Sequence, residues 1–373
     1  MNSSTRLAGH WRALTSPIVV LTVSLLLAAC QGQPAATPTT APPPTTTPGV
    51  TEQPATPTPV AEADPVSFGV LRAPTGALAV VTGENGWFDD AGVDVEFVSF
   101  AEGGGPAIIQ AMGGGSPDIA LLNLATTVLA LGQGTFDVQI VSIAANPAAA
   151  LPLLATAEIE SVEDLRGQRV STPQGGGQYY LLAAILDKHG MTLEDIDYRP
   201  LPIGDAQAAF LTGQLDAVIS SVNGTVLIQR NAPDTHVLFD GTDFDPADAY
   251  FSPDVLIATR QAVENNPEGI RRFVRAFHER GIAYLNDSAT RDEAIQDIQD
   301  YMTSVGAGVE EIELTRIGVD AIEFYSLEGA RDRLTDDAFL DAINRQVDFW
   351  MDAGVIENAP DVPAAVNTTL IAP

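Results

Sequence analysis

The segment Pro173-Gln174-Gly175-Gly176-Gly177 has the composition of a ligand-binding loop. It follows a short predicted strand at 169–172 and precedes a helix that starts at Gln178. A strand that turns through glycines into a helix points free backbone N–H groups and the positive end of the helix dipole at the loop. This arrangement favours a small anionic or polar ligand. The alternative is that the glycines only let the strand and the helix pack closely.

Three polar residues end predicted strands elsewhere in the chain. Arg72 follows the strand at 66–71 and could pair with a carboxylate, sulfonate or phosphate, or else form a salt bridge within the protein. Asn123 follows the buried strand at 118–122 and is a candidate for a polar ligand contact. Glu102 could select a ligand amine, or could complement the start of a helix.

Aromatic side chains near these loops have two interpretations. Tyr179 and Tyr180 could stack on a ligand ring, or could pack against the rest of the fold. Trp87 lies near a predicted turn and is more typical of a core residue than of a ligand platform.

Catalytic and metal-binding motifs are not found. His189, His236 and His278 are the histidines outside the first thirty residues, and none has the spacing of a metal site such as H-E-x-x-H. The G-x-S-x-G motif that carries a nucleophilic serine is absent. Lys188 lies at a predicted helix end and is expected to be solvated. We therefore expect a binding protein without a catalytic residue, metal or cofactor.

The order of predicted elements indicates an α/β fold. Strand, loop and helix alternate in units of 20–25 residues, which is typical of a mostly parallel sheet flanked by helices. Ligands of open α/β sheets bind at the carboxyl ends of the strands. Here those ends carry the loops 72–76, 102–105 and 123–126. A later strand at 250–259 is expected to return to the first lobe, and the chain is largely helical from 265 onward.

The charge of the chain excludes some functions. With 18 Lys and Arg against 49 Asp and Glu, the net charge is −31, which repels nucleic acid. Hydrophobic residues make up 45% of the chain, which is enough for a sizeable core.

The N-terminus has the pattern of a bacterial lipoprotein. The apolar run at 18–28 has 11 residues, shorter than the about 20 needed to span a bilayer, and fits a secretory signal. Leu27-Ala28-Ala29-Cys30 resembles a lipobox, so we expect a signal peptide at 1–29 and a lipid on Cys30, the only cysteine. The alternative is an ordinary signal cut after Ala29. A Pro- and Thr-rich linker follows to residue 64.

Four segments carry a resemblance to a known family. They are SVEDLRGQRVSTPQGGGQYYLLAAILDKHGM (161–191), PIGDAQAAFLTGQLDAVISS (202–221), NNPEGIRRFVRAFHERGIAYL (265–285) and NRQVDFWMDAGVI (344–356). The chain resembles the solute-binding lipoproteins of ABC importers, in the branch for nitrate, sulfonate, taurine and thiamine-precursor ligands.

This resemblance implies a periplasmic-binding-protein-like fold with two α/β lobes and a ligand cleft between them. Lobe one would comprise 65–156 and 246–373, and lobe two 157–245. Hinge closure would trap the ligand, and ABC permease and ATPase subunits would be the partners of a monomeric, extracytoplasmic receptor. By position the ligand contacts would be Arg72, Thr75, Gly103, Gly104, Asn123, Thr126, Gly175, Gly176, Gly177, Gln178 and Asn223.

The chain departs from many relatives in its Gly-Gly-Gly-Gln loop, which lacks the Ser or Thr hydroxyls before the helix. We expect a sulfonate, taurine or nitrate-like ligand. The alternatives are a receptor for a thiamine pyrimidine precursor or riboflavin, an enzyme of pyrimidine-precursor synthesis on the same fold, and a receptor that signals to a sensor protein.

Overall fold

The computed structural model describes residues 64–100, 104–134, 137–241, 252–306 and 311–372. The predicted signal peptide, the lipidation site Cys30 and nearly all of the predicted linker lie outside the described residues. Two predicted loop residues, Glu102 and Gly103, lie outside them as well.

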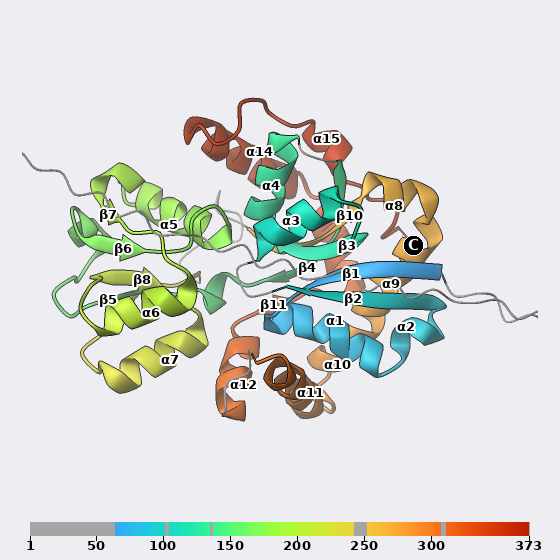
Figure 1. Ribbon diagram of the computed structural model, residues 1–373, viewed down its shortest axis with the longest axis horizontal. Helices are drawn as coiled ribbons and strands as arrows, with labels where there is room; N and C mark the ends of the chain where they lie inside the picture. The colour runs from blue at the N-terminus through green and yellow to red at the C-terminus, as the bar shows by residue number, and fades with distance from the viewer. Residues whose placement is uncertain (1–63, 101–103, 135–136, 242–251, 307–310, 373) are drawn as a thin grey trace, which may run out of the picture. The chain divides into compact units, whose positions relative to one another are not determined.

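The first sheet has six strands in the order β11-β4-β10-β3-β1-β2 (Figure 1). β1 pairs in parallel with β2 and β3, whereas β10 runs antiparallel to both β3 and β4. The late strand expected at 250–259 corresponds to β10, which lies between β3 and β4 in this sheet. The strands are β1 (Asp64–Leu71), β2 (Val93–Phe100), β3 (Ile119–Asn123), β4 (Val138–Asn146), β10 (Asp254–Thr259) and β11 (Glu323–Phe324).

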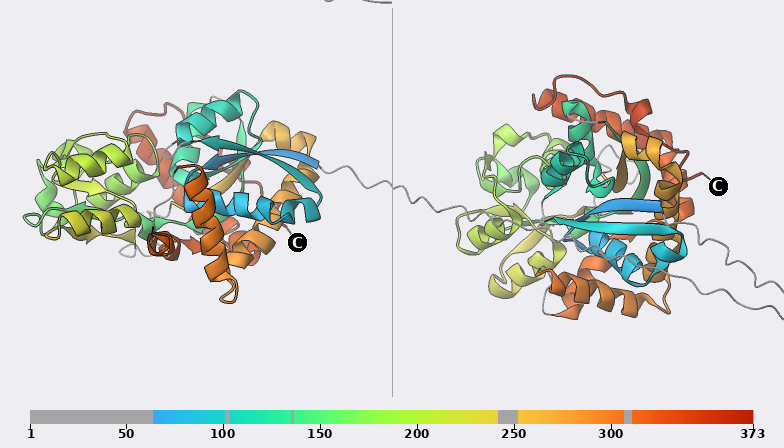
Figure 2. Two further views of the ribbon diagram at one scale, coloured as in Figure 1. Left: turned by 60° about the horizontal axis from the view of Figure 1, so that its bottom comes forward. Right: turned by 45° about the vertical axis from the view of Figure 1, so that its right-hand side comes forward.

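Helices cover both faces of this sheet. In Figures 1 and 2, α1 and α2 lie on one side of β1 and β2, and α3 and α4 lie on the other. The helices of this lobe are α1 (Pro74–Glu84), α2 (Trp87–Asp90), α3 (Gly105–Gly113), α4 (Leu124–Gln133), α8 (Arg260–Asn265), α9 (Pro267–Ala276), the π-helical turn η5 (Phe277–Ile282), α10 (Ala283–Asn286), α11 (Arg291–Ser304), α12 (Ile312–Asp320), α13 (Leu327–Leu334), α14 (Asp337–Asp352) and α15 (Val362–Ala365).

The second sheet has five strands in the order β7-β6-β8-β5-β9. β6 is parallel to β7 and β8, and β5 is antiparallel to β8 and β9. Its strands are β5 (Leu153–Ala155), β6 (Arg169–Ser171), β7 (Asp197–Tyr198), β8 (Ala217–Ile219) and β9 (His236–Phe239). Its helices are α5 (Gly177–Lys188), α6 (Ile203–Leu211) and α7 (Val222–Asn231), with short 3-10 turns η2 (Val162–Leu165) and η3 (Leu193–Asp195).

One strand lies in a different lobe from the one we predicted. The strand at 151–156 was expected in lobe one, but β5 belongs to the five-stranded sheet. Leu153 packs with the cluster around Leu182, and Leu154 packs with the cluster around Phe210, so both faces of β5 are covered by lobe two. An apolar run buried on both faces carries no signal for the sheet it joins. The chain therefore crosses between lobes before β5, through 147–152, which includes the turn η1 (Ala148–Ala150).

Both sheets are mixed. The predicted parallel pairing holds where a helix connects consecutive strands, as for β1 and β2. It fails at β5, β10 and β11, where the chain enters a sheet from elsewhere in the fold and runs in the opposite direction. This reversal has a consequence for the site, because the first residue of an antiparallel strand lies beside the last residues of its neighbours.

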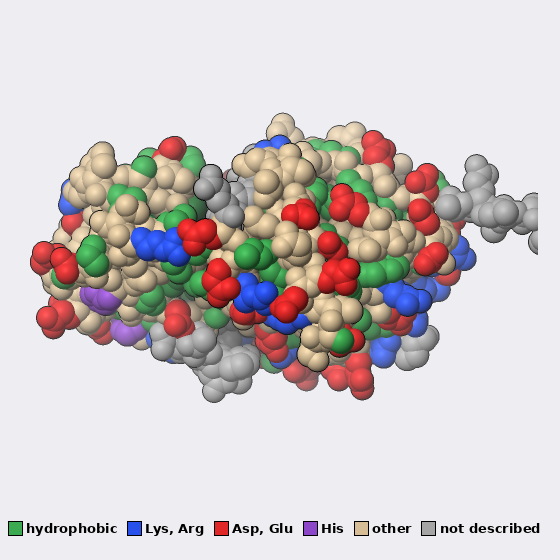
Figure 3. All heavy atoms as spheres, turned by 90° about the horizontal axis from the view of Figure 1, so that it is seen from below, with side chains coloured by type: hydrophobic (Ala, Val, Ile, Leu, Met, Phe, Trp, Pro, Cys, Tyr) green, Lys and Arg blue, Asp and Glu red, His purple; other side chains and the backbone are tan. Residues whose placement is uncertain are grey.

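Within the described part of the chain, no helix is both long and apolar enough to cross a membrane. Acidic side chains are scattered over the face shown in Figure 3. They agree with the strong negative charge of the sequence.

Candidate ligand-binding site

A cavity of about 200 Å³ lies where the carboxyl ends of β1 and β3 meet the glycine loop before α5. Most of the residues predicted to contact ligand line it together: Thr75, Asn123, Thr126, Gly175, Gly176, Gly177 and Gln178. Gly104 is not part of the lining but caps α3, and the next two residues, Gly105 and Pro106, do line the cavity.

A second cavity of about 240 Å³ contains the other two predicted residues, Arg72 and Asn223. It lies between the start of α1 in lobe one and the starts of α6 and α7 in lobe two. Ala73, Pro74 and Ile322 line both cavities. The predicted site is therefore divided into two neighbouring compartments with a common wall.

Helix N-termini from both lobes open onto the two cavities. α1, α3, α4 and α5 each contribute first-turn residues to the lining of the first cavity, and α1, α6 and α7 to that of the second. The N-cap residues Ala73, Gly104 and Gly176 provide no side-chain hydrogen bond to their helices. First-turn N–H groups without such a cap carry partial positive charge and are suited to bind an anion. These helix N-termini thus bring partial positive charge to both cavities, although the net charge of the chain is negative.

Arg72 adds a full positive charge at the second cavity. No hydrogen bond or ion pair to Arg72 is found among the described residues, and its Nε is buried without a partner. The alternative interpretation, in which Arg72 forms a salt bridge within the protein, therefore has no support among the described residues. Asn223 Oδ1 in the same cavity is also buried without a partner.

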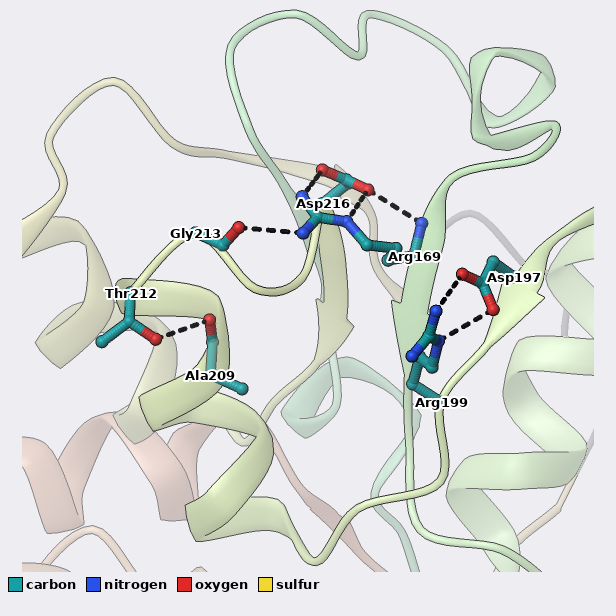
Figure 4. A network of polar contacts seen from close by, with 7 residues as sticks. All are labelled: Arg169, Asp197, Arg199, Ala209, Thr212, Gly213 and Asp216. Atoms are coloured by element: carbon teal, nitrogen blue, oxygen red, sulfur yellow. Dashed lines mark hydrogen bonds and ion pairs between the residues drawn. The ribbon is translucent and has the colours of Figure 1, made fainter.

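Other arginines are neutralised away from the cavities. In lobe two, Arg169 donates to both oxygens of Asp216 at 2.6 and 2.8 Å, and Arg199 forms the same two-pronged pair with Asp197 (Figure 4). Hydrogen bonds from these guanidinium groups lower the pKa values of Asp216 and Asp197. Arg169 and Asp216 lie at the amino ends of β6 and β8, opposite the carboxyl ends that lead to the site, and Arg199 directly follows the two-residue strand β7.

Asn123 is fixed by the protein itself. Its Oδ1 accepts hydrogen bonds from Ala125 N at 3.1 Å and from Ser252 Oγ at 2.8 Å, and its Nδ2 donates to Ser252 O at 2.8 Å. Its first role is thus to cap α4 and hold the strand β10 segment in place. Thr126, one turn into α4, is nearly buried at 7% exposure.

The two lobes come into direct contact at the glycine loop. A methyl group added at Gly177 would lie 2.7 Å from Cγ and Oδ1 of Asn123, and one added at Gly176 would lie 3.6 Å from Thr126 Oγ1. On the other side of the cleft, a methyl group at Gly318 of α12 would lie 2.8 Å from Asn223 Oδ1. The glycines at 177 and 318 therefore permit the close approach of one lobe to the other.

The aromatic residues for which ligand stacking and packing were both considered pack against other aromatic side chains. Tyr179 stacks on Trp350 with centroids 5.8 Å apart and an interplanar angle of 11°, and Tyr180 meets Phe349 edge-on at 5.2 Å. These contacts join α5 of lobe two to α14 of lobe one. Trp87 packs against Tyr284 at 5.1 Å. Neither tyrosine lines the two cavities.

Asp254 is an ionisable residue of the site that was not among the predicted residues. It lines the first cavity, and its carboxyl group interacts with the side chains of Asn123 and Thr75. Burial raises its pKa to about 6, against a smaller opposing effect of those hydrogen bonds. The sequence carried no signal for it, because the predicted strand at 250–259 put Asp254 in mid-strand, and its place beside Asn123 depends on β10 running antiparallel to β3.

Comparison with known proteins finds relatives that are named as binding proteins. A "Putative binding protein" of Brucella abortus is 28% identical over 218 residues, covering 58% of this chain and 65% of the relative. A "Putative aliphatic sulfonates-binding protein" of Escherichia coli is 28% identical over 197 residues, covering 52% and 57%. The chain thus spans less than two thirds of the length of these curated relatives.

Solved structures share the fold. The periplasmic aliphatic sulphonate binding protein SsuA of Escherichia coli superposes with a TM-score of 0.68 at 19% identity, covering 82% of this chain and 92% of that protein. The desulfurization enzyme DSZB superposes with a TM-score of 0.57 at 14% identity, so the fold alone does not separate binding from catalysis.

Residues 74–289, more than half of the chain, match the family described as NMT1/THI5 like. This match begins at α1 and extends through the glycine loop, the second lobe and β10, and so includes most of the cavity-lining elements. The chain belongs to the NMT1/THI5-like family.

Proposed function

We propose that this protein is an extracytoplasmic receptor that captures a small anionic solute between its lobes and delivers it to an ABC importer. The observation that supports this most strongly is the convergence of uncapped helix N-termini and the unpaired Arg72 on two adjoining cavities. In the low-dielectric cleft, such donors stabilise an anion more than they would in water. A sulfonate, taurine or nitrate-like ligand fits this chemistry.

Closure of the two lobes would complete the site. The chain crosses between the sheets at 147–152, and it returns to β10 through a segment that lies partly outside the described residues. Segments that cross between two lobes are the usual position of a hinge. Binding would draw α5 toward α4, and the permease would then meet a closed receptor anchored to the membrane through a lipid on Cys30.

The heteroaromatic alternative receives less support. A ring-binding site needs an exposed aromatic face, and Tyr179 and Tyr180 already pack on α14. For an enzyme, we note that no histidine, cysteine or lysine lines either cavity in the described part of the chain. The same fold does occur in a desulfurization enzyme, so catalysis is the second function to test.

A thermal-shift screen of the purified protein tests the proposal. The panel would hold alkanesulfonates, taurine, nitrate, small carboxylates, pyrimidine precursors and riboflavin. A ligand at 100 times its Kd adds about 2.7 kcal/mol to the free energy of unfolding. We expect a shift with at least one anion, and Arg72→Ala should abolish it. A shift confined to uncharged rings, or one unaffected by Arg72→Ala, would contradict the proposal.

A further inference from the structure

Asp254 occupies an unusual place for a carboxyl group. As the first residue of β10 it pairs across the sheet with Asn123 on one side and Ala145 on the other. It therefore lies at the carboxyl end of β3, among the helix N-termini that face the first cavity. It is the one ionisable side chain that lines this cavity in the described part of the chain.

The surroundings of Asp254 do not neutralise it. Leu71, Leu121 and Leu122 supply apolar walls of the same cavity. No ion pair to Asp254 is found among the described residues, and its hydrogen-bond partners Asn123 and Thr75 are uncharged. The desolvation of an unpaired carboxylate lowers the stability of a fold. Strong desolvation of such a group inside a cleft is a feature of functional sites.

Asp254 also conflicts with a simple anion site. A bare sulfonate or nitrate in the first cavity would lie near a carboxylate of the same sign, which opposes binding. The second cavity, which shares Ala73, Pro74 and Ile322 with the first, offers the unpaired Arg72 instead. A ligand that occupies both adjoining cavities would meet both charges at once.

We infer that Asp254 determines ligand specificity by accepting a hydrogen bond from an amino or ammonium group, so that the ligand of this receptor is a small amino-bearing anion. Its anionic group would bind at Arg72 and the helix N-termini, and its amino group at Asp254 with Thr75 and Asn123 beside it. This inference rests on the proposed function, and it narrows the ligand from small anions in general to those with a donor at the opposite end.

Matched compounds test the inference. Each pair differs only in an amino group: ethanesulfonate and 2-aminoethanesulfonate (taurine), propanoate and 3-aminopropanoate, benzenesulfonate and 4-aminobenzenesulfonate. Binding is measured by calorimetry on the full purified protein at pH 7.5. We expect the amino member of the pair that binds to be favoured by tenfold or more.

The variant Asp254→Asn keeps the shape and hydrogen-bonding capacity of the side chain but removes its charge. We expect this variant to bind the amino compound more weakly, so that the affinities of the two members of a pair become nearly equal. We also expect it to raise the melting temperature at pH 7.5. Asp137→Asn is the matched control. Asp137 pairs with Arg260 at the other end of β10, so removal of the Asp137 charge should leave the ratio of the two affinities unchanged.

The pH dependence provides an independent readout. Since burial raises the pKa of Asp254, acidification from pH 7.5 to pH 5 should protonate it and reduce the preference for 2-aminoethanesulfonate, whose own charges do not change over this range. Thr75 and Asn123, which contact the carboxyl group, do not titrate. This pH-dependent loss of preference for 2-aminoethanesulfonate should be absent in Asp254→Asn.

The outcomes separate the two proposals. If an anion binds through Arg72 but the members of its pair bind equally, or if Asp254→Asn leaves the ratio unchanged, the role of Asp254 is wrong and the anion receptor stands. If no anion in the panel binds, both proposals fail.

Discussion

The close contact between the lobes at Gly177 leads to a sharp prediction. Gly177→Ala would place a methyl carbon 2.7 Å from Cγ and Oδ1 of Asn123, whereas ordinary van der Waals contacts start at about 3.4 Å. Asn123 cannot retreat easily, because three hydrogen bonds to Ala125 and Ser252 hold its amide. The start of α5 must therefore move away from α4 by roughly 0.7 Å, the difference between the two separations.

The size of the effect follows from overpacking. Forcing one extra methyl group into a close-packed contact costs about 1–3 kcal/mol. If closure brings these groups together, that cost opposes ligand binding and weakens the affinity by about 5- to 150-fold. In an isolated helix, alanine would instead be favoured over glycine by up to about 1 kcal/mol. The steric contact thus makes Gly177→Ala unfavourable, whereas helix propensity alone predicts a favourable change.

Gly176→Ala is the matched control. Its added methyl group would lie 3.6 Å from Thr126 Oγ1, an ordinary contact, and the φ of −173° is extended backbone that any residue adopts. Calorimetry would use the panel anion that gives the largest thermal shift with the wild type. We expect Gly177→Ala to weaken binding and Gly176→Ala to have little effect. Equal affinities for the two variants would refute the steric argument.

Three further predictions concern other parts of the molecule. Tyr179→Leu removes the stack on Trp350 that links the lobes, so it should weaken ligand affinity by about 3- to 10-fold, as expected for an aromatic pair worth about 0.5–1.5 kcal/mol; Trp87→Leu, within lobe one, should lower stability but not affinity in the same titration. His278 is 1% exposed, and burial lowers its pKa to about 4 despite the hydrogen bond to Tyr325 O. The unfolded state therefore binds a proton first as the pH falls, so stability should be lost between pH 6.5 and pH 4 by up to roughly 3 kcal/mol from this group; urea titrations should show a shallower loss in His278→Gln, and an identical slope would contradict the assignment. Cys30→Ala should move the protein from the membrane fraction to the soluble fraction and abolish incorporation of labelled palmitate; unchanged membrane association would argue against the lipid anchor.

The sequence by itself determined the local features of the site. The glycine loop before α5, the strand ends at Arg72 and Asn123, and the helix start at Asn223 follow from periodicity and from residues with strong backbone preferences. Such signals are local, since they depend on neighbours within one helical turn or one strand. The resemblance to a family of binding proteins then supplied the expectation that these segments converge.

Only the tertiary structure decided how the predicted residues are divided. It placed Arg72 and Asn223 in one cavity and the glycine loop in another, and it used Asn123 as a helix cap. It also moved β5 to the second lobe and brought Asp254 to the ligand edge. These outcomes depend on which strands pair and in which direction, and on contacts between residues more than a hundred positions apart. A short apolar strand carries the same sequence pattern in either sheet and either direction, so its partners are fixed only when the whole core packs.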